Sequence, residues 1–484
     1  MQPTLSNYLL RNGSYIGGNW HNSDNFFAVI NPADGQQLHQ VANAGVEQAT
    51  DAIAAASDAF TRWSTQPAAK RSEILYAWYQ LLISHTKDLA LLLTAEQGKP
   101  LAEAETEIQY GASYLQWFAE QAKRMDGDTI PAPSADKRII VQRQAVGVVA
   151  AITPWNFPNA MMMRKAAAAL AAGCTFVVKP AQLTPLSALA MAVLAEEAGI
   201  PKGVFNVVVG TDAKALGTVL TSDPRVAKFS FTGSTAVGKV LAAQCAQDVK
   251  RVTMELGGNA PFIVFDDADL DAAVQGLLVA KFRNAGQTCV CANRVLVHQA
   301  VYSRFTEKLI TAVQQLQVGS GLVAGSDLGP LISKEALDKV ETLVQEAVEQ
   351  GAKVELGGQR HSAGAQFYQP TILSQVTADM QISQQEIFGP VIALQTFTDE
   401  AQAIALANDT KYGLAAYFYS RDVGRVFRVS QALQFGMVGI NDGAISNAAA
   451  PFGGIKQSGY GREGSKYGLD DYTDIKYLCL GGLA

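Results

Sequence analysis

The sequence predicts an α/β protein with a parallel, doubly wound sheet and at least two domains, and this prediction rests on two alternating segments and on the chain length. Short β-rich runs alternate with helical segments between residues 174 and 256, and a second alternation follows from residue 261. Strands joined by helices imply a parallel sheet whose ligand crevice lies at the carboxyl ends of its strands. The chain has 484 residues. One hydrophobic core stops growing at about 250–300 residues, so we expect at least two domains.

The first third of the chain is expected to be mostly helical. Apolar residues recur there at helical spacing, which indicates helices with one face toward the core. Residues 138–152 then show the partial alternation of an extended segment, with a turn at Gly147. The two core stripes consist of Ile74, Leu75, Trp78, Leu81 and Leu82, and of Ile108, Leu115, Phe118 and Ala122.

The two alternations supply the main strands. In the first, strands are predicted at 174–178, 205–209, 226–231 and 252–256, with helices near 187–197 and 235–247. In the second, strands are predicted at 261–265, 294–298, 391–397, 416–420 and 436–440, with helices near 301–315 and 334–350. Residues 472–480 alternate like a strand but have no obvious partner within their own chain. Addition to a sheet of another subunit would give them one.

Composition narrows the class of protein. The net charge of -6 argues against a nucleic-acid partner, which would require a basic face. Residues 1–12 lack the pattern of a secretory signal, and the longest apolar run, 166–178, is shorter than the roughly 20 residues that span a membrane. Five cysteines in so long a chain do not form a disulfide framework. We therefore expect a cytoplasmic protein without a membrane partner.

The segment from Gly233 to Lys239 could be mistaken for a phosphate-binding P-loop. It follows a predicted strand and opens a helix, but Val240 stands where that loop needs Ser or Thr to hold Mg²⁺. An NTPase is thus a distant alternative. Gly233, Ser234 and the start of the helix suit a pyrophosphate, although the dinucleotide pattern G-x-G-x-x-G is absent from this junction.

Cys289 is the candidate nucleophile. It lies in a loop rich in glycine and small polar residues, which keeps a thiol reachable, although two chance cysteines in a turn would look the same. The pair Cys289 and Cys291 lacks zinc-site spacing, so no metal is expected. Only five histidines occur and none is placed to form a dyad, so the candidate base is Glu255 at the end of a strand. A buried ion pair is the alternative for Glu255.

Seven motifs occur along nearly the whole chain: TPWNFP (153–158), VVKPA (177–181), FTGSTAVG (231–238), MELGGNAPFIVFDDADLD (254–271), GQTCVC (286–291), EIFGPV (386–391) and PFGGIKQSG (451–459). In order and spacing they resemble the aldehyde dehydrogenase superfamily. Within it, FRNAGQTCVCANR (282–294) and GREGSKYG (461–468) are most similar to succinate-semialdehyde dehydrogenases, with glutarate-semialdehyde dehydrogenases close behind.

The resemblance implies a catalytic role for three residues. Cys289 would attack the aldehyde carbon, and the amide of Asn156 with the backbone N–H of Cys289 would hold the oxyanion. After hydride transfer, Glu255 would activate water to hydrolyse the thioester. No metal is needed for these steps.

The resemblance also implies a cofactor site. Lys179 would contact the adenosine ribose, Ser234 the pyrophosphate, Glu386 the nicotinamide ribose, and Phe388 would lie beside the ring. Gln182 replaces a glutamate that in relatives repels a 2′-phosphate, which favours NADP with NAD as a second cofactor. The implied site consists of Thr153, Pro154, Trp155, Lys179, Gln182, Gly233, Ser234, Leu256, Glu386 and Phe388.

For the substrate, the resemblance implies that Arg164, Arg283 and Ser446 hold the far carboxylate of succinic semialdehyde. Paired hydrogen bonds from guanidinium suit a carboxylate, but each arginine could instead bind an acidic neighbour in the fold. Glutaric semialdehyde is the alternative substrate, because one methylene contributes only about 1–3 kcal/mol of discrimination. Cys291 could form a regulatory disulfide with Cys289 or be a spectator.

The implied fold has a Rossmann-type cofactor domain, an α/β catalytic domain and a small β element for oligomerisation. We expect the cofactor domain at 1–124 and 145–255, and the catalytic domain at 256–455. Residues 125–144 and 456–484 would form the bridging element of a homodimer or homotetramer.

Overall fold

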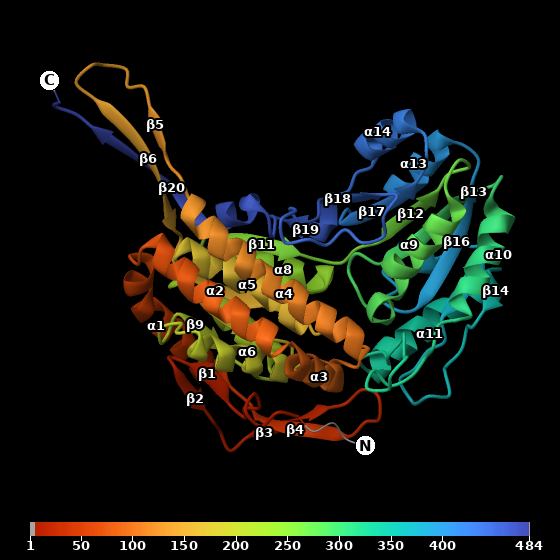
Figure 1. Ribbon diagram of the computed structural model, residues 1–484, viewed down its shortest axis with the longest axis horizontal. Coiled ribbons are helices and arrows are strands. Elements are labelled where there is room, and N and C mark those ends of the chain that lie inside the picture. The colour runs from red at the N-terminus through yellow and green to blue at the C-terminus, as the bar shows by residue number, and fades with distance from the viewer. Residues whose placement is uncertain (1–4, 484) are drawn as a thin grey trace.

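The computed structural model describes residues 5–483 as two α/β bodies side by side and an arm that projects from the first (Figure 1). The first body contains an eight-stranded sheet with its five central strands parallel, as predicted. Its order is β19 (Gly459–Tyr460), β11 (Arg251–Glu255), β10 (Val226–Thr232), β7 (Val148–Ile152), β8 (Thr175–Lys179), β9 (Phe205–Val207), β1 (Ser14–Ile16) and β2 (Asn19–His21).

Helices cover both faces of this sheet. α5 is buried along its whole length, because its small and apolar residues run through the core. Pro158 starts α5, where a missing N–H costs nothing, and Gly173 ends it with a φ of 96°. The helices are α1 (Val46–Ser64), α2 (Ala68–Ser84), α3 (Thr86–Gln97), α4 (Leu101–Gln121), α5 (Pro158–Ala172), α6 (Pro185–Glu197), α7 (Ala213–Ser222) and α8 (Thr235–Ala246).

The second body has its own core and a seven-stranded sheet that is parallel except at β14–β15. The order is β14 (Lys353–Leu356), β15 (Thr371–Ser374), β16 (Val391–Phe397), β13 (Ala292–His298), β12 (Ala260–Val264), β17 (Ala415–Tyr419) and β18 (Met437–Ile440). Its helices are α9 (Leu270–Phe282), α10 (Tyr302–Val313), α11 (Lys334–Glu349), α12 (Gln381–Gln384), α13 (Glu400–Asn408) and α14 (Val423–Ala432). Aspartate or serine side chains cap the starts of α9, α11, α13 and α14.

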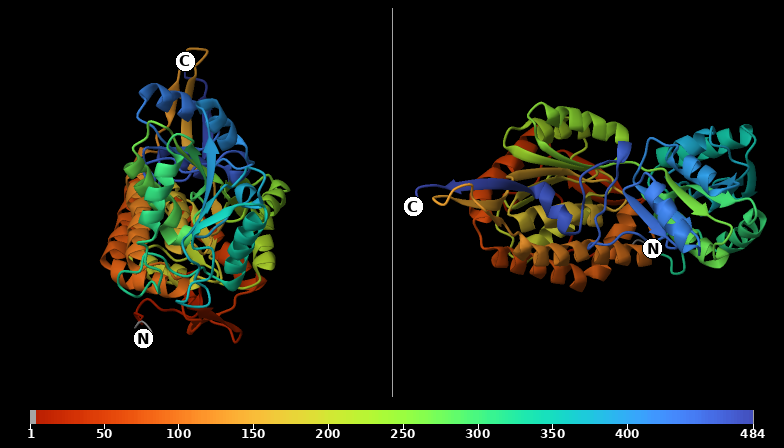
Figure 2. Two further views of the ribbon diagram at one scale, coloured as in Figure 1. Left: turned by 90° about the vertical axis from the view of Figure 1, so that its right-hand side faces the viewer. Right: turned by 90° about the horizontal axis from the view of Figure 1, so that it is seen from above.

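The arm consists of β20 (Thr473–Leu480), β6 (Arg138–Ala145) and β5 (Asp128–Ile130), and it stands away from both bodies (Figure 2). The alternating pattern gave the C-terminal strand no obvious partner in its own chain, but the structure provides one within the segment that the resemblance grouped with it. β20 pairs antiparallel with β6 from Thr473 opposite Ala145 to Leu480 opposite Arg138. Period-2 alternation predicts a strand but does not identify its partner, especially one so distant in sequence.

The first third of the chain is less helical than predicted. Residues 14–42 form β1, β2, β3 (Phe26–Ile30) and β4 (Gln37–Ala42), and strands of three to six residues are too short to show a clear period. The boundary predicted at residue 256 falls in the connection between β11 and β12, which belong to different sheets. Within residues 5–483, no helix has both the length and the apolar character needed to cross a membrane.

Candidate active site

A cavity of about 390 Å³ lies between the two bodies. The first body contributes the carboxyl ends of its parallel strands: Thr232 ends β10, Glu255 ends β11, and residues 154–156 follow β7. The second body contributes the loops around Cys289 and Glu386 and the segment at Ser446. This is the crevice that a doubly wound sheet predicts at the ends of its strands.

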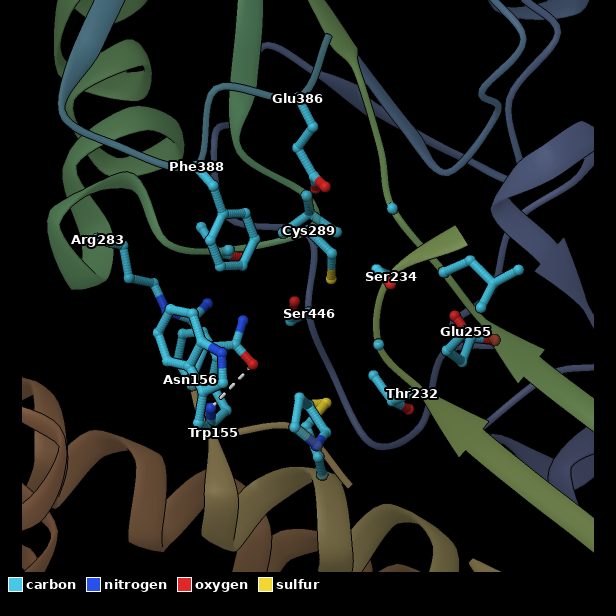
Figure 3. A pocket seen from close by; sticks show the side chains of 18 of the residues that line it. Trp155, Asn156, Thr232, Ser234, Glu255, Arg283, Cys289, Glu386, Phe388 and Ser446 are labelled. Carbon is cyan, nitrogen blue, oxygen red and sulfur yellow. Dashed lines mark hydrogen bonds between the residues drawn. The ribbon is translucent and has the colours of Figure 1, made fainter. Parts of the chain in front are cut away.

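The structure brings most of the predicted residues together. Figure 3 shows Cys289 in the middle of the cavity, with Asn156 and Arg283 to one side and Ser234 and Glu255 to the other. The predicted residues that line the cavity are Pro154, Trp155, Asn156, Arg164, Gly233, Ser234, Glu255, Leu256, Arg283, Cys289, Glu386, Phe388 and Ser446. Four others lie outside its lining: Thr153, Lys179, Gln182 and Cys291.

The Cys289 thiol is neutral before substrate binds. Desolvation raises its pKa to about 12, and the carboxyls of Glu386 and Glu255 act in the same direction. The guanidinium groups of Arg164 and Arg283 oppose this shift without overcoming it. Nucleophilic attack by this sulfur therefore requires a group that accepts its proton.

Glu255 can accept that proton. It is 2% exposed, and neither carboxyl oxygen has a hydrogen-bond partner among the described residues. Burial, and then the nearby charge of Glu463, raise the pKa of Glu255 well above its ordinary value. A carboxyl whose pKa lies above the usual range can both take up and release a proton near neutral pH.

Asn156 presents an amide to the same cavity. Its Nδ2 donates to the main-chain oxygen of Gln287 at 2.9 Å, which uses one of its two N–H bonds. Its Oδ1 accepts from the N–H of Phe157 at 3.1 Å, which orients the amide with its nitrogen toward the Cys289 loop. The second N–H is available to an oxygen in the cavity.

The two predicted substrate arginines differ in their partners. Arg164 is 1% exposed and forms a 2.6 Å ion pair with Glu463, which is the acidic neighbour anticipated as its alternative. The Arg283 guanidinium stacks 4.5 Å from the centroid of the Phe157 ring and has no ion pair within residues 5–483. Arg283 is therefore the better-placed cation for an anionic substrate.

Several residues fit a dinucleotide with phosphate groups. Lys179 is 4% exposed, and burial lowers its pKa to about 8. Among residues 5–483, its Nζ donates only to the main-chain oxygen of Pro180, at 3.3 Å. A buried ammonium without a carboxylate beside it suits an anionic ligand. Ser234 caps α8, so the first N–H groups of that helix face the cavity side. Glu386 accepts from the N–H of Gly258 at 3.1 Å, and desolvation raises its pKa to about 7.

The contacts give no support to a P-loop at residues 233–239 or to a disulfide between Cys289 and Cys291. Lys239 donates to Gln457 at 2.9 Å instead of facing a phosphate loop. Cys291 is buried and donates to the main-chain oxygen of Lys281 at 3.4 Å, on the side of α9, so a disulfide with Cys289 would require the loop to rearrange. Across residues 5–483, no three His, Cys, Asp or Glu side chains cluster as metal ligands.

Sequence reasoning missed part of the lining. Four of the additional side chains that line the cavity are aromatic or apolar: Tyr110, Phe157, Met161 and Phe452. Tyr110 lies on α4 and its hydroxyl is 2.7 Å from that of Tyr114. The helical stripe on α4 indicated which residues face the core, but periodicity cannot separate a core position from one that borders a cavity.

Comparisons with known proteins agree with this geometry. Three relatives each match 98% of the chain and 98–99% of their own length. They are an NADP⁺ succinate-semialdehyde dehydrogenase of Escherichia coli (58% identical), a 3-sulfolactaldehyde dehydrogenase of Pseudomonas putida (57%) and a glutarate-semialdehyde dehydrogenase of Pseudomonas aeruginosa (57%). The crystal structure of a succinate-semialdehyde dehydrogenase from Burkholderia pseudomallei is 56% identical, with a TM-score of 0.98 over 99% of this chain and all of that one.

The resemblance found in the motifs is thus confirmed over nearly the whole length. Residues 20–478 match the aldehyde dehydrogenase family, and the fold is that of its solved members. This chain belongs to the aldehyde dehydrogenase family.

Proposed function

We propose that this enzyme oxidises succinic semialdehyde to succinate with NADP⁺, and also uses NAD⁺. The observation that carries the proposal is Arg283, an arginine that forms no ion pair with any described residue and lies in the same cavity as Cys289. The three relatives are named for aldehydes that also carry an anionic group, a carboxylate or a sulfonate. A cation facing the nucleophile suits such a substrate.

The chain's own residues supply the proton transfers. Cys289 Sγ bonds to the aldehyde carbon as its proton passes to Glu255, and the carbonyl oxygen becomes an oxyanion held by the Asn156 amide. A hydride then leaves the thiohemiacetal carbon for the nicotinamide acceptor, which leaves a thioester, and Glu255 releases its proton to solvent. Glu255 next takes a proton from water, whose oxygen attacks the thioester carbon; the C–S bond breaks, the acid is released, and Glu255 returns the proton to the Cys289 sulfur.

When bound, the oxidised nicotinamide cofactor supplies the hydride acceptor. Lys179 would neutralise a phosphate at the adenosine end, and the start of α8 at Ser234 would donate to the pyrophosphate. Glu386 would hold the nicotinamide ribose, with Phe388 packed against Trp155 at 5.5 Å beside it. Gln182, three positions after Lys179 in the sequence, is exposed and neutral. A neutral side chain there does not repel a 2′-phosphate, which supports the preference for NADP⁺.

Glutaric semialdehyde is the second candidate. It carries the same two reacting ends as succinic semialdehyde and one more methylene, which changes discrimination by about 1–3 kcal/mol. The glutarate-semialdehyde relative is 57% identical, against 58% for the succinate-semialdehyde relative. A direct comparison of both substrates is therefore part of the test.

We also propose that the enzyme works in the cytoplasm as a homodimer or homotetramer. A reducing compartment keeps Cys289 a thiol, and all five cysteines are free. Apolar side chains on β20 support an assembly through the arm: Ile475 and Tyr477 are more than half exposed.

We further propose that the domain boundaries lie at residues 125, 145 and 256.

The experiment is the appearance of reduced cofactor after mixing purified protein with succinic semialdehyde, glutaric semialdehyde or 3-sulfolactaldehyde, each with NADP⁺ or NAD⁺. We expect the highest kcat/KM for succinic semialdehyde with NADP⁺, and none for Cys289→Ala. A higher value for another of the three aldehydes would replace the substrate while keeping the mechanism. Folded, reduced protein that is inactive with all three would contradict the proposal.

A further inference from the structure

The two loops that carry Asn156 and Cys289 are joined by an asparagine outside the cavity lining, Asn284, which is 1% exposed. Asn284 Nδ2 donates to the main-chain oxygens of Asn156 at 2.9 Å and of Gln287 at 3.3 Å. The Asn156 side chain donates to the same Gln287 oxygen at 2.9 Å. One buried amide therefore connects the peptide of Asn156 to a peptide two residues before the nucleophile.

Asn284 is itself held from the side of α3 and α4. Its Oδ1 accepts from Gln97 Nε2 at 2.9 Å, and its backbone N–H donates to Glu103 at 2.7 Å. Its main-chain oxygen accepts from the Gln287 N–H at 3.0 Å. Every polar atom of Asn284 has a partner, so its amide cannot rotate without losing several buried hydrogen bonds.

The backbone here adopts a conformation that suits this residue. Asn284 has φ 53° and ψ 38°, and Ala285 follows at φ 54°. Asparagine is one of the few residues other than glycine that tolerate this left-handed region. Two such residues in succession, five and four positions before Cys289, are locally strained, so the surrounding contacts must stabilise this backbone conformation.

A buried lysine supports the same peptide. Lys99 Nζ donates to the Asn156 oxygen at 2.8 Å and forms a 2.5 Å ion pair with Glu107. The other Glu107 oxygen accepts from the N–H groups of Asn159 and Ala160, at the start of α5. The main-chain oxygen of Asn156 thus receives two donors, Asn284 and Lys99, on the face away from the cavity.

We propose that Asn284 is a positioning residue that sets the Asn156 amide against the Cys289 loop, so that the oxyanion of the thiohemiacetal meets a prearranged donor. It acts through Asn156 and touches no substrate. The inference rests on the proposed role of Asn156 as oxyanion donor, and it identifies Asn284 as the residue that positions this donor.

The test is a double-mutant cycle with Asn284→Gly and Asn156→Ala. Glycine keeps the left-handed backbone and removes only the amide. Asn156→Ala should lower the first-turnover rate about 10²–10³-fold. Asn284→Gly should lower it roughly 10–100-fold with KM within about two-fold, because a small misplacement of a catalytic donor has effects of this size. The double variant should be no slower than Asn156→Ala alone.

Asn441→Gly is the matched control. Asn441 also has a left-handed φ, of 54°, and its amide exchanges two 3.0 Å hydrogen bonds with Ser420, outside the cavity. This variant should keep the parent first-turnover rate. Asn284→Asp keeps the size of the side chain but places an acceptor against two carbonyl oxygens, so it should lose at least as much as Asn284→Gly.

Alkylation of Cys289 by iodoacetamide separates positioning from general damage, since that reaction needs no oxyanion donor. Its rate should stay within about three-fold of the parent in Asn284→Gly. The inference would be overturned if the two losses of first-turnover rate multiplied in the double variant. It would also be overturned if Asn284→Gly raised only KM, or if its alkylation rate fell as much as its first-turnover rate. A parent enzyme inactive with every semialdehyde would instead contradict the proposed function.

Discussion

Replacing Arg283 with methionine should separate anionic aldehydes from neutral ones. The guanidinium lies in the cavity with Cys289, stacks on Phe157 and has no ion pair in the described part of the chain. A hydrogen bond to a charged group contributes about 1.5–3 kcal/mol, which corresponds to roughly 10–150-fold in kcat/KM. Arg283 is only half-buried, so solvent screening places the expected loss toward the lower end of that range.

The assay compares succinic semialdehyde with butyraldehyde, which has the same chain length and no carboxylate. Arg283→Met should lower kcat/KM about ten-fold or more for the first and leave the second within about two-fold. Equal losses for the two aldehydes would refute a role in binding the carboxylate, and so would unchanged values for both.

Arg164→Met provides the contrast, because its guanidinium is paired with Glu463 and packs 3.7 Å from the centroid of the Phe452 ring. Breaking a buried pair commonly costs about 3–5 kcal/mol, although Lys165 remains beside Glu463 and reduces the cost. Thermal unfolding should show a clear drop in Tm for this variant and little change for Arg283→Met. The reverse order would contradict the assignment of the two arginines.

The remaining predictions concern the base and the cofactor. Because burial raises the pKa of Glu255, the steady-state rate should rise with pH as this carboxyl ionises. Glu255→Gln should slow both the stopped-flow burst of reduced cofactor and the later turnovers about 100-fold, because Glu255 first accepts the Cys289 proton and then activates water. A burst at the parent rate would show that another group accepts the Cys289 proton. The pKa of Lys179 is about 8, so kcat/KM for NADP⁺ should fall as pH rises through that value, because the ammonium loses its charge. The same fall in Lys179→Met would show that another group causes this pH dependence. Gln182→Glu should lower kcat/KM for NADP⁺ roughly ten-fold more than for NAD⁺, by charge repulsion of the 2′-phosphate; an unchanged ratio would remove Gln182 from cofactor selection.

Much of the fold could be predicted from periodic patterns. The strands from β7 to β12 and the helices α6 and α8 were expected within a few residues, because each buries apolar residues with the period of its own backbone. The buried helix α5 was not predicted. The short strands up to residue 42 were missed, and the pattern alone left β20 without an obvious partner, although the resemblance grouped residues 456–484 with residues 125–144. Pairing joins segments far apart in the chain, and no local period records it.

The candidate site divides in the same way. The sequence by itself determined the family and predicted Cys289 as the nucleophile and Glu255 as the base, because these depend on residue type within short motifs. Only the tertiary structure decided that Arg164 is paired with Glu463 while Arg283 is not, and that Asn284 joins two catalytic loops. Hydrogen bonds, desolvation and ion pairing depend on which distant segments meet, and burial then sets the protonation state of each group that the motifs supply.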